Sequence, residues 1–154
     1  MMKLLELRVP PPAVMVVAAL LMWLIARALP SLDFQLPARR TLALGIALIG
    51  LAIAVFAVFQ FRRAGTTPNP MKPHESATLV VTGMYRFSRN PMYLGDVVIL
   101  AAWALWLANA AAFVLLPVFV AYINRFQIAP EERALESRYG AAYAGYRRAV
   151  RRWL

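Results

Sequence analysis

Two long apolar runs dominate the first part of the chain. Residues 10–29 form the first run, in which Arg27 is the one charged residue, and Pro30 ends it. Residues 41–61 form the second run and contain no charged residue. A helix needs about 20 apolar residues to cross the roughly 30 Å hydrocarbon core of a bilayer, and each run reaches that length. The pattern therefore predicts two transmembrane helices, at about 10–29 and 41–61.

A third apolar region, residues 97–123, contains one strongly polar residue, Asn109. It could form one long tilted helix or two shorter helices that fold back at Asn109. Basic residues are frequent both before this region, in residues 62–93, and after it, in the C-terminal tail. Because Lys and Arg concentrate on the cytoplasmic side of membrane proteins, a hairpin that keeps both basic segments on one side is favoured. We therefore predict helices at about 91–108 and 110–128.

These four helices describe an all-α, polytopic membrane protein whose last two helices form a hairpin and whose two termini are cytoplasmic. Three arginines of the first connection fall on the outer side, but the basic residues assigned to the inside outnumber them. The length of 154 residues fits a single domain, residues 1–154. That domain would carry a polar loop at 64–90 and a polar tail at 130–154. A multi-pass protein of the cell inner membrane is the expected localisation.

Composition supports the bilayer as the environment of the chain. Hydrophobic residues make up 62% of it, more than the roughly 45–50% of soluble domains. The net charge is +10, but the arginines lie between and after apolar runs, which suits anionic lipid headgroups better than nucleic acid. The lack of Cys excludes disulfides and thiolate chemistry. With His74 as the single histidine, no metal site is expected.

The polar loop at 64–90 leads into a helix start. It is either a solvated connector or a functional segment. Asn90 and Pro91 favour a helix that begins there, because Asn accepts hydrogen bonds from free backbone N–H groups and Pro loses none at the first position. Arg86 and Arg89 would lie beside this N-terminus. Together they predict a site for an anionic group such as a carboxylate or a phosphate.

Asp96 is the carboxylate that falls inside a predicted span. Arg89, Tyr93 and Asp96 recur at helical spacing, so they share one face. A carboxylate in a membrane helix is costly and usually faces the bundle interior or water. Asp96 therefore either pairs with Arg89 near the interface or has a chemical role.

The tail begins with Pro130, Glu131 and Glu132, a pattern typical of a helix opening, because acidic residues complement the positive end of a helix. This helix would end near Tyr139, with Gly140 as its stop. The residues that follow mix aromatic rings with arginines, which suits the headgroup region of a membrane, with RNA binding as the competing interpretation. They are Tyr143, Tyr146, Arg147, Arg148, Arg151, Arg152 and Trp153.

Four blocks of residues occur in a fixed order from about residue 66 to residue 153. They are Ser76–Val80, Thr82–Tyr85, Arg89–Gly95, and Pro130–Glu132 followed by Tyr139, Gly140 and Tyr143. In this order and spacing they resemble the isoprenylcysteine carboxyl methyltransferase and phospholipid methyltransferase superfamily of integral membrane enzymes. The resemblance implies methyl transfer from S-adenosylmethionine to a lipophilic or membrane-embedded small molecule, through a carboxylate, an amine or a thiol.

The resemblance also implies where the cofactor binds. The polar loop and the start of the third helix would line the cofactor pocket, and Glu131 would form a hydrogen bond with a polar part of the cofactor. The residues implied to bind the cofactor are Ala77, Thr78, Leu79, Val80, Tyr85, Arg89, Asn90, Pro91, Met92, Tyr93 and Glu131. If the acceptor is an amine, a group must take up a proton, and Asp96, Glu132 and Tyr93 are the catalytic candidates.

Two positions depart from the eukaryotic prenylcysteine enzymes of this superfamily. Asn90 stands where they have His, and Asn cannot carry a proton near pH 7. Gln127 stands where they have an Arg that holds the substrate carboxylate, although Arg125 is nearby. We therefore take Arg125 and Gln127 as candidate substrate-binding residues, and a prenylcysteine substrate is less favoured.

Two other functions remain open at this point. The related membrane sterol reductases share the architecture but use NADPH, and a non-catalytic lipid-binding membrane protein could retain the outline of the pocket. The short polar loop and the Pro-Glu-Glu block favour the methyl donor. Methyl transfer from a sulfonium also needs no protein nucleophile, which agrees with a chain that has no Cys.

Overall fold

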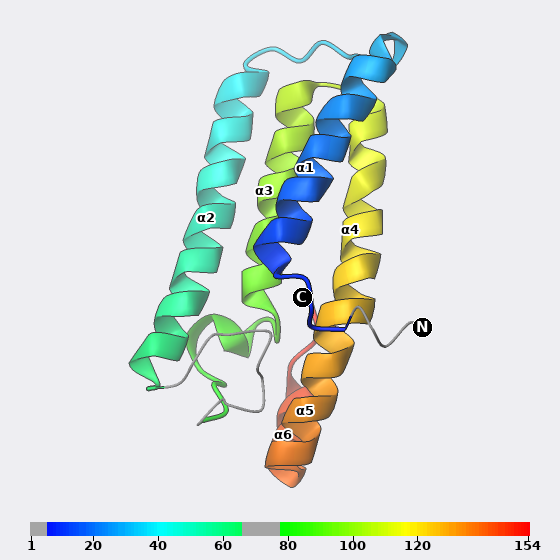
Figure 1. Ribbon diagram of the computed structural model, residues 1–154. Helices are drawn as coiled ribbons and strands as arrows, with labels where there is room; N and C mark the ends of the chain where they lie inside the picture. Colours follow the sequence, from blue (N-terminus) through cyan, green and yellow to red (C-terminus); the bar gives the residue numbers. More distant parts are fainter. Residues whose placement is uncertain (1–5, 66–77) are drawn as a thin grey trace.

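A bundle of long helices makes up the protein. The computed structural model describes residues 6–65 and 78–154, and the regular structure in these ranges is helical. The long helices α1 (Pro11–Ala28), α2 (Arg39–Arg63) and α3 (Pro91–Leu107) stand beside a fourth, composite helix (Figure 1). The prediction of an all-α polytopic membrane protein is confirmed.

Within residues 6–65 and 78–154, three helical segments are long and apolar enough to cross a bilayer. They are α1 with 18 residues, α2 with 25 residues, and the continuous segment Ala110–Tyr139 with 30 residues. Helix α3 is also apolar but has 17 residues, which at about 1.5 Å per residue corresponds to roughly 25 Å. Lipid-facing side chains such as Val16, Leu48 and Phe56 are more than half exposed, as expected of helices that face hydrocarbon.

The fourth helix is longer than its sequence suggests. It consists of a 3-10 turn η5 (Ala110–Val114), α4 (Leu115–Ile123), a π-helical turn η6 (Asn124–Ile128) and α5 (Ala129–Tyr139), without a break. The predicted boundary near residue 128 coincides with the junction of η6 and α5, and α5 ends at Tyr139 with Gly140 after it, as predicted. The sequence did not indicate that the helical backbone continues across this junction. A proline ring in a regular helix collides with the carbonyl four residues earlier. The wider π turn before Pro130 gives the ring room, so the helix continues through it.

Asn109 forms the hairpin between α3 and η5, as predicted. Ala108 ends α3 in the left-handed region at φ 52°, and the Asn109 side chain accepts a hydrogen bond from the Ala111 N–H at 3.0 Å. Its amide nitrogen donates to the Leu29 carbonyl and to Asp33 Oδ1, both at 2.8 Å. The fully buried Asn109 therefore fastens the end of α1 and the following loop to the hairpin.

Asn109→Ala should destabilise the protein by about 2–4 kcal/mol, because it removes a helix cap and the two hydrogen bonds that the buried amide donates to Leu29 and Asp33. Thermal unfolding in detergent would measure the effect. Gln35→Ala is the matched control, since Gln35 is exposed in the connection between α1 and α2 that Asn109 contacts. Equal unfolding temperatures for the two variants would contradict the role of Asn109.

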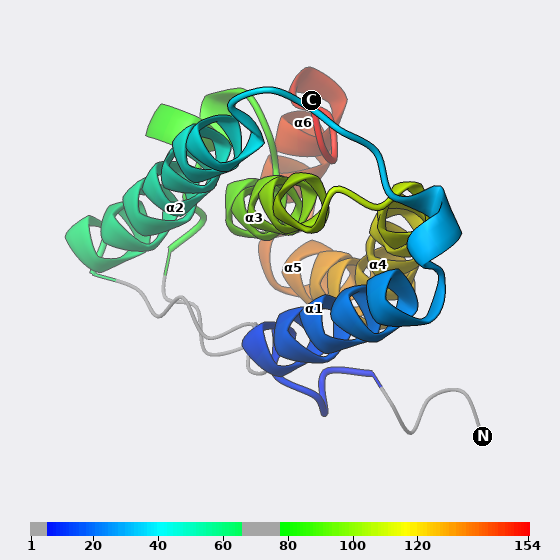
Figure 2. The same cartoon turned by 90° about the horizontal axis from the view of Figure 1, so that it is seen from above.

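Helix α3 lies at the centre of the bundle. Seen from above, α2 lies on one side of α3, and α1 and α4 lie on the other (Figure 2). The buried core joins α1, α3 and the fourth helix through residues such as Met22, Leu100 and Ile123. On the opposite side, α2 and α3 meet at Gly50 and Gly95, where a Cβ added to Gly95 would lie 2.7 Å from the Gly50 carbonyl oxygen. Such close approach through small residues is typical of membrane helix pairs.

Candidate functional site

The segments that contain the candidate site residues lie together at one end of the bundle. The end of α2, the start of α3, the 3-10 turn η4 (Gly83–Arg86), α5 and α6 (Ala141–Ala149) lie at this end, which we call the site end (Figure 1). Residues from the second half of the polar loop and from the Pro-Glu-Glu block are thus neighbours, although about 40 positions separate them in the chain.

A hydrogen bond between Tyr93 and Glu131 joins the two blocks. The Tyr93 hydroxyl on α3 donates to Glu131 Oε1 on α5, and the Tyr93 side chain is buried. A carboxylate in this setting keeps a second oxygen and further lone pairs with which to accept hydrogen bonds. The contact therefore leaves Glu131 able to hold a ligand while Tyr93 fixes its orientation.

Arg89 pairs with Glu132 and not with Asp96. Arg89 Nη2 lies 3.0 Å from Glu132 Oε1, and only about a tenth of either side chain is exposed. The interpretation of Asp96 as the partner of Arg89 is therefore wrong, because the carboxylate brought by α5 lies closer to the guanidinium. Arg89 Nε and Nη1 are buried and have no hydrogen-bond partner among the described residues. Two donors of a charged group are thus available to an anion.

Asp96 is half-buried and forms no hydrogen bond or ion pair with another described residue. On the same stripe of α3, Ile99 lies against α2 at Gly50, and the Trp103 indole donates to the Ala19 carbonyl of α1 at 3.0 Å. Asp96 therefore lies on the side of α3 between its contacts with α1 and α2, one turn beyond Tyr93.

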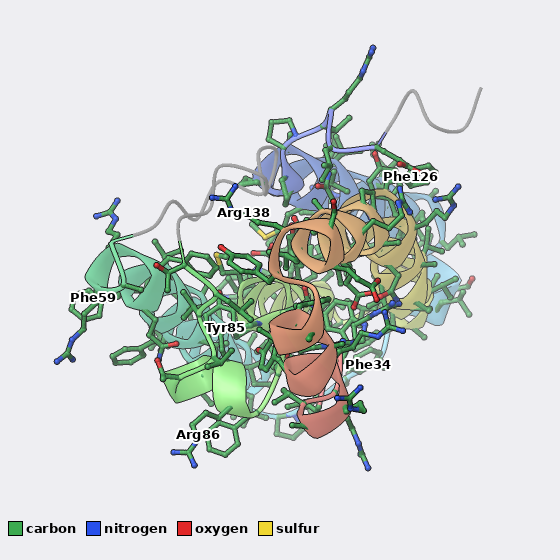
Figure 3. All side chains as sticks on the ribbon, turned by 90° about the horizontal axis from the view of Figure 1, so that it is seen from below. Phe34, Phe59, Tyr85, Arg86, Phe126 and Arg138 are labelled. Atoms are coloured by element: carbon green, nitrogen blue, oxygen red, sulfur yellow. The ribbon has the colours of Figure 1, made fainter. Side chains whose placement is uncertain are left out.

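Tyr85 belongs to η4 and lies on the inner side of that turn, whereas Arg86 points away from the bundle (Figure 3). Its ring packs edge-on against Phe61 with centroids 5.2 Å apart. Its hydroxyl has no partner among the described residues. Burial raises the pKa of Tyr85 well above that of an ordinary phenol, so the hydroxyl stays protonated and can donate. Arg86 is exposed and does not join Arg89 as we had expected.

The turn η4 is held by the end of α2. The Met84 N–H donates to Gln60 Oε1 at 3.1 Å. Gly83 has φ +60°, and a Cβ there would overlap the Gln60 amide. Glycine is required at this position because only it combines the left-handed backbone with such close approach.

Asn90 precedes α3, but its side chain does not cap the helix. Asn90 Nδ2 instead donates to the Arg152 carbonyl at 3.0 Å, and the Asn90 N–H donates to Ser88 Oγ at 3.1 Å. The predicted helix start at Pro91 is confirmed, and the predicted cap is wrong, because the C-terminal tail supplies a competing acceptor.

Three candidates for the cofactor pocket, Val80, Tyr85 and Met92, belong to a small apolar cluster. Val80 and Tyr85 are buried against Ala57 of α2, with Met92 and Tyr146 packed on them. Leu79 is half-buried, Pro91 is buried and Thr78 is exposed. Ala77, and with it His74, lies outside the described residues.

Comparison with known proteins gives the class of the chain. The sequence model of the phospholipid methyltransferase family matches residues 38–142. The chain belongs to the phospholipid methyltransferase family. It is thus a membrane methyltransferase by family. The match runs from the start of α2 into α6 and includes Tyr93, Glu131 and Glu132.

Two further comparisons add little to this assignment. A protein of Haemophilus influenzae, described as uncharacterized, is 51% identical over 63 residues, which is 41% of this chain and all of that protein. No solved structure matches the chain.

The two candidate substrate-binding residues of this phospholipid methyltransferase family member differ in their surroundings. Gln127 is fully buried, and its Nε2 donates to the Val9 carbonyl at 2.7 Å. Gln127 Oε1 is buried without a partner among the described residues. Arg125 is exposed, and its guanidinium lies 3.0 Å from Glu6 Oε1. Gln127 thus faces the protein interior, while Arg125 ties the fourth helix to the N-terminal segment.

The last residues lie beyond the range that matches the family model, yet they contact the site end. Tyr143 is buried, and the Tyr146 hydroxyl donates to the Tyr85 carbonyl at 2.7 Å. Trp153 Nε1 donates to Asn124 Oδ1 at 3.1 Å. These three rings pack on the protein, and their place in the headgroup region stays a prediction. Among the tail arginines, Arg147, Arg148 and Arg151 are exposed.

Proposed function

We propose that the protein transfers a methyl group from S-adenosylmethionine to a lipophilic acceptor at the cytoplasmic face of the inner membrane, as a single domain. The observation that carries this proposal is the contact between Tyr93 and Glu131, which unites the Asn90–Tyr93 block with the Pro130–Glu132 block. Membership of a membrane methyltransferase family supports the reaction class. The basic residues of the site end support the cytoplasmic orientation.

The free polar groups at the site end fit the parts of this cofactor. Arg89 offers two buried N–H donors, which suit the carboxylate of an amino-acid group. Glu131 retains acceptor capacity for an ammonium group or for ribose hydroxyls. The Tyr85 hydroxyl is a further unpaired donor. Val80 and Met92 provide the apolar surface that a purine ring requires.

The cofactor would supply an activated methyl group on a sulfonium centre, so the chain needs no nucleophile of its own. The tasks left to the protein are to bind, to align the acceptor and to exclude water. Tyr93 and Arg89 are fixed by α5 and are suited to alignment. The apolar cluster of Val80, Tyr85 and Met92 is suited to excluding water.

The side chains of Asp96 and Gln127 favour an amine over a carboxylate as the methyl acceptor. Asp96 lies inside an apolar helix without a partner among the described residues, and a positively charged or proton-releasing group would offset the cost of that carboxylate. Gln127 uses one of its two amide N–H donors on the Val9 carbonyl, and its acceptor oxygen has no partner among the described residues. Both groups would accept hydrogen bonds from an amine, and Asp96 would take up the proton that the amine releases.

Asp96→Asn should lower kcat by about 100-fold, because a positioned proton acceptor typically contributes about 10²–10⁴-fold. The dissociation constant of S-adenosylhomocysteine should stay unchanged. Initial rates of methyl transfer and calorimetry would measure the two quantities. Glu136→Gln is the control, since Glu136 is exposed on α5. An unchanged kcat in Asp96→Asn would contradict this role.

The proposed function is tested with the purified protein in nanodiscs, a radiolabelled methyl donor and a total membrane lipid extract. We expect label in a lipophilic product, whose mass identifies the acceptor. A thermal-shift comparison of S-adenosylhomocysteine with NADPH separates the methyltransferase from a reductase. Stabilisation by NADPH alone would overturn the proposal, and stabilisation by neither would leave a non-catalytic lipid-binding protein.

A further inference from the structure

We propose that Arg152 is a positioning residue for cofactor binding, and that residues 151–153 act as a clamp across the two walls of the site. This inference rests on the proposed function. One wall is the start of α3, from Ser88 to Tyr93, and the other is formed by η6 and α5. We call residues 151–153 the C-terminal clamp.

The clamp holds the start of α3 through its backbone. The Arg151 carbonyl accepts a hydrogen bond from the Arg89 N–H at 3.0 Å. The Arg152 carbonyl accepts from Ser88 Oγ at 3.3 Å and from Asn90 Nδ2 at 3.0 Å. Three consecutive residues before α3 are therefore tied to the last residues of the chain, and Ser88 is buried beneath them.

The clamp holds the opposite wall through its side chains. Arg152 Nε and Nη2 donate to the two oxygens of Glu132 at 3.1 and 2.6 Å, a bidentate contact. The Trp153 indole donates to Asn124 in the π-helical turn. The clamp therefore joins the two walls in addition to the direct contacts of Tyr93 with Glu131 and of Arg89 with Glu132.

Arg152 also affects the contact between Arg89 and Glu132. Glu132 lies between two guanidinium groups, with Arg89 Nη2 at 3.0 Å and Arg152 Nη2 at 2.6 Å. Since Arg152 binds both oxygens, Arg89 keeps a single contact with Glu132, and its Nε and Nη1 have no partner among the described residues. Without Arg152, a bidentate contact between Arg89 and Glu132 would become the favourable arrangement and would consume donors that the cofactor carboxylate needs.

The fold at the site end does not depend on Arg152. Tyr143 is buried at the base of α6, and Tyr146 holds η4 through the Tyr85 carbonyl. The Arg152 side chain is 38% exposed, so its removal opens no large cavity. We therefore expect Arg152→Ala to remain folded and to change the binding of one part of the cofactor.

The test compares two ligands that differ in their amino-acid group. S-adenosylhomocysteine carries that group, and 5′-methylthioadenosine lacks it. In Arg152→Ala, calorimetry should show S-adenosylhomocysteine bound about tenfold more weakly, a change of about 1.4 kcal/mol, and 5′-methylthioadenosine bound as in the wild type. Arg152→Lys should recover part of the affinity. Arg148→Ala is the matched control, since it removes the same charge from an exposed position on α6 outside the clamp.

Each other outcome overturns the inference. Equal affinities of Arg152→Ala and Arg148→Ala for S-adenosylhomocysteine would show that Arg152 does not position Arg89. Equal weakening of both ligands, with a lower unfolding temperature, would show a structural role only. A wild-type protein that binds neither ligand would overturn the proposed function itself, and the role of the clamp with it.

Discussion

Glu131→Ala should weaken the binding of S-adenosylhomocysteine by about 100-fold or more. Truncating one partner of a buried, hydrogen-bonded charge contact typically costs about 2–5 kcal/mol. The substitution would remove the carboxylate and also leave the buried Tyr93 hydroxyl without its acceptor. Calorimetry on the purified protein would measure the affinity.

Two further variants make this result specific. Glu131→Gln keeps an acceptor for Tyr93 but loses the charge, so its affinity should fall between those of the wild type and Glu131→Ala. Glu136→Ala changes an exposed carboxylate on the same helix and should bind as the wild type does. An unchanged affinity in Glu131→Ala would refute the assigned role of this residue.

Gly95→Ala should destabilise the protein by about 3 kcal/mol, near the upper end of the usual cost of overpacking. The added methyl group would lie 2.7 Å from the Gly50 carbonyl oxygen, 2.9 Å from the Ala54 Cβ and 3.0 Å from the Ala54 nitrogen. Two of these atoms are backbone and cannot rotate away, so α2 and α3 must separate. Thermal unfolding in detergent would measure the loss of stability.

Gly45→Ala is the matched control for this substitution. Gly45 lies on α2, and a Cβ there would meet no atom within 4 Å. Alanine at an open helical position should be neutral, or more stable by up to about 1 kcal/mol. If Gly95→Ala unfolded at the same temperature as Gly45→Ala, close packing of α2 on α3 would not be needed for stability.

The arrangement of the helices follows closely from the sequence. The predicted spans at 10–29 and 41–61 correspond to α1 at Pro11–Ala28 and α2 at Arg39–Arg63. The distribution of basic residues led to the hairpin at Asn109, which the structure has. The sequence predicted the helix end at Tyr139 but not the continuity at Pro130, because proline is a local signal for a break and only the π turn before it allows the helix to continue.

The partners of the site residues were harder to predict. Arg89, Tyr93 and Asp96 do share spacing on one helix, but the ion pair of Arg89 is with Glu132. Asn90 is a good capping residue by type, yet its side chain reaches the Arg152 carbonyl. In both cases the partner lies more than 40 positions away in the chain. Local spacing carries no information about such distant partners.

By itself, the sequence determined the environment and the spans of this protein, because a bilayer admits only long apolar segments whose backbone hydrogen bonds are satisfied within the helix. Its motif blocks also indicated the family that the comparison then identified. Only the tertiary structure decided which carboxylate Arg89 meets, and that the Arg151 and Arg152 carbonyls accept hydrogen bonds from the segment before α3. Those contacts depend on the packing of α5 and α6 against the start of α3. Charge pairing acts over a few ångströms in space, whatever the separation along the chain.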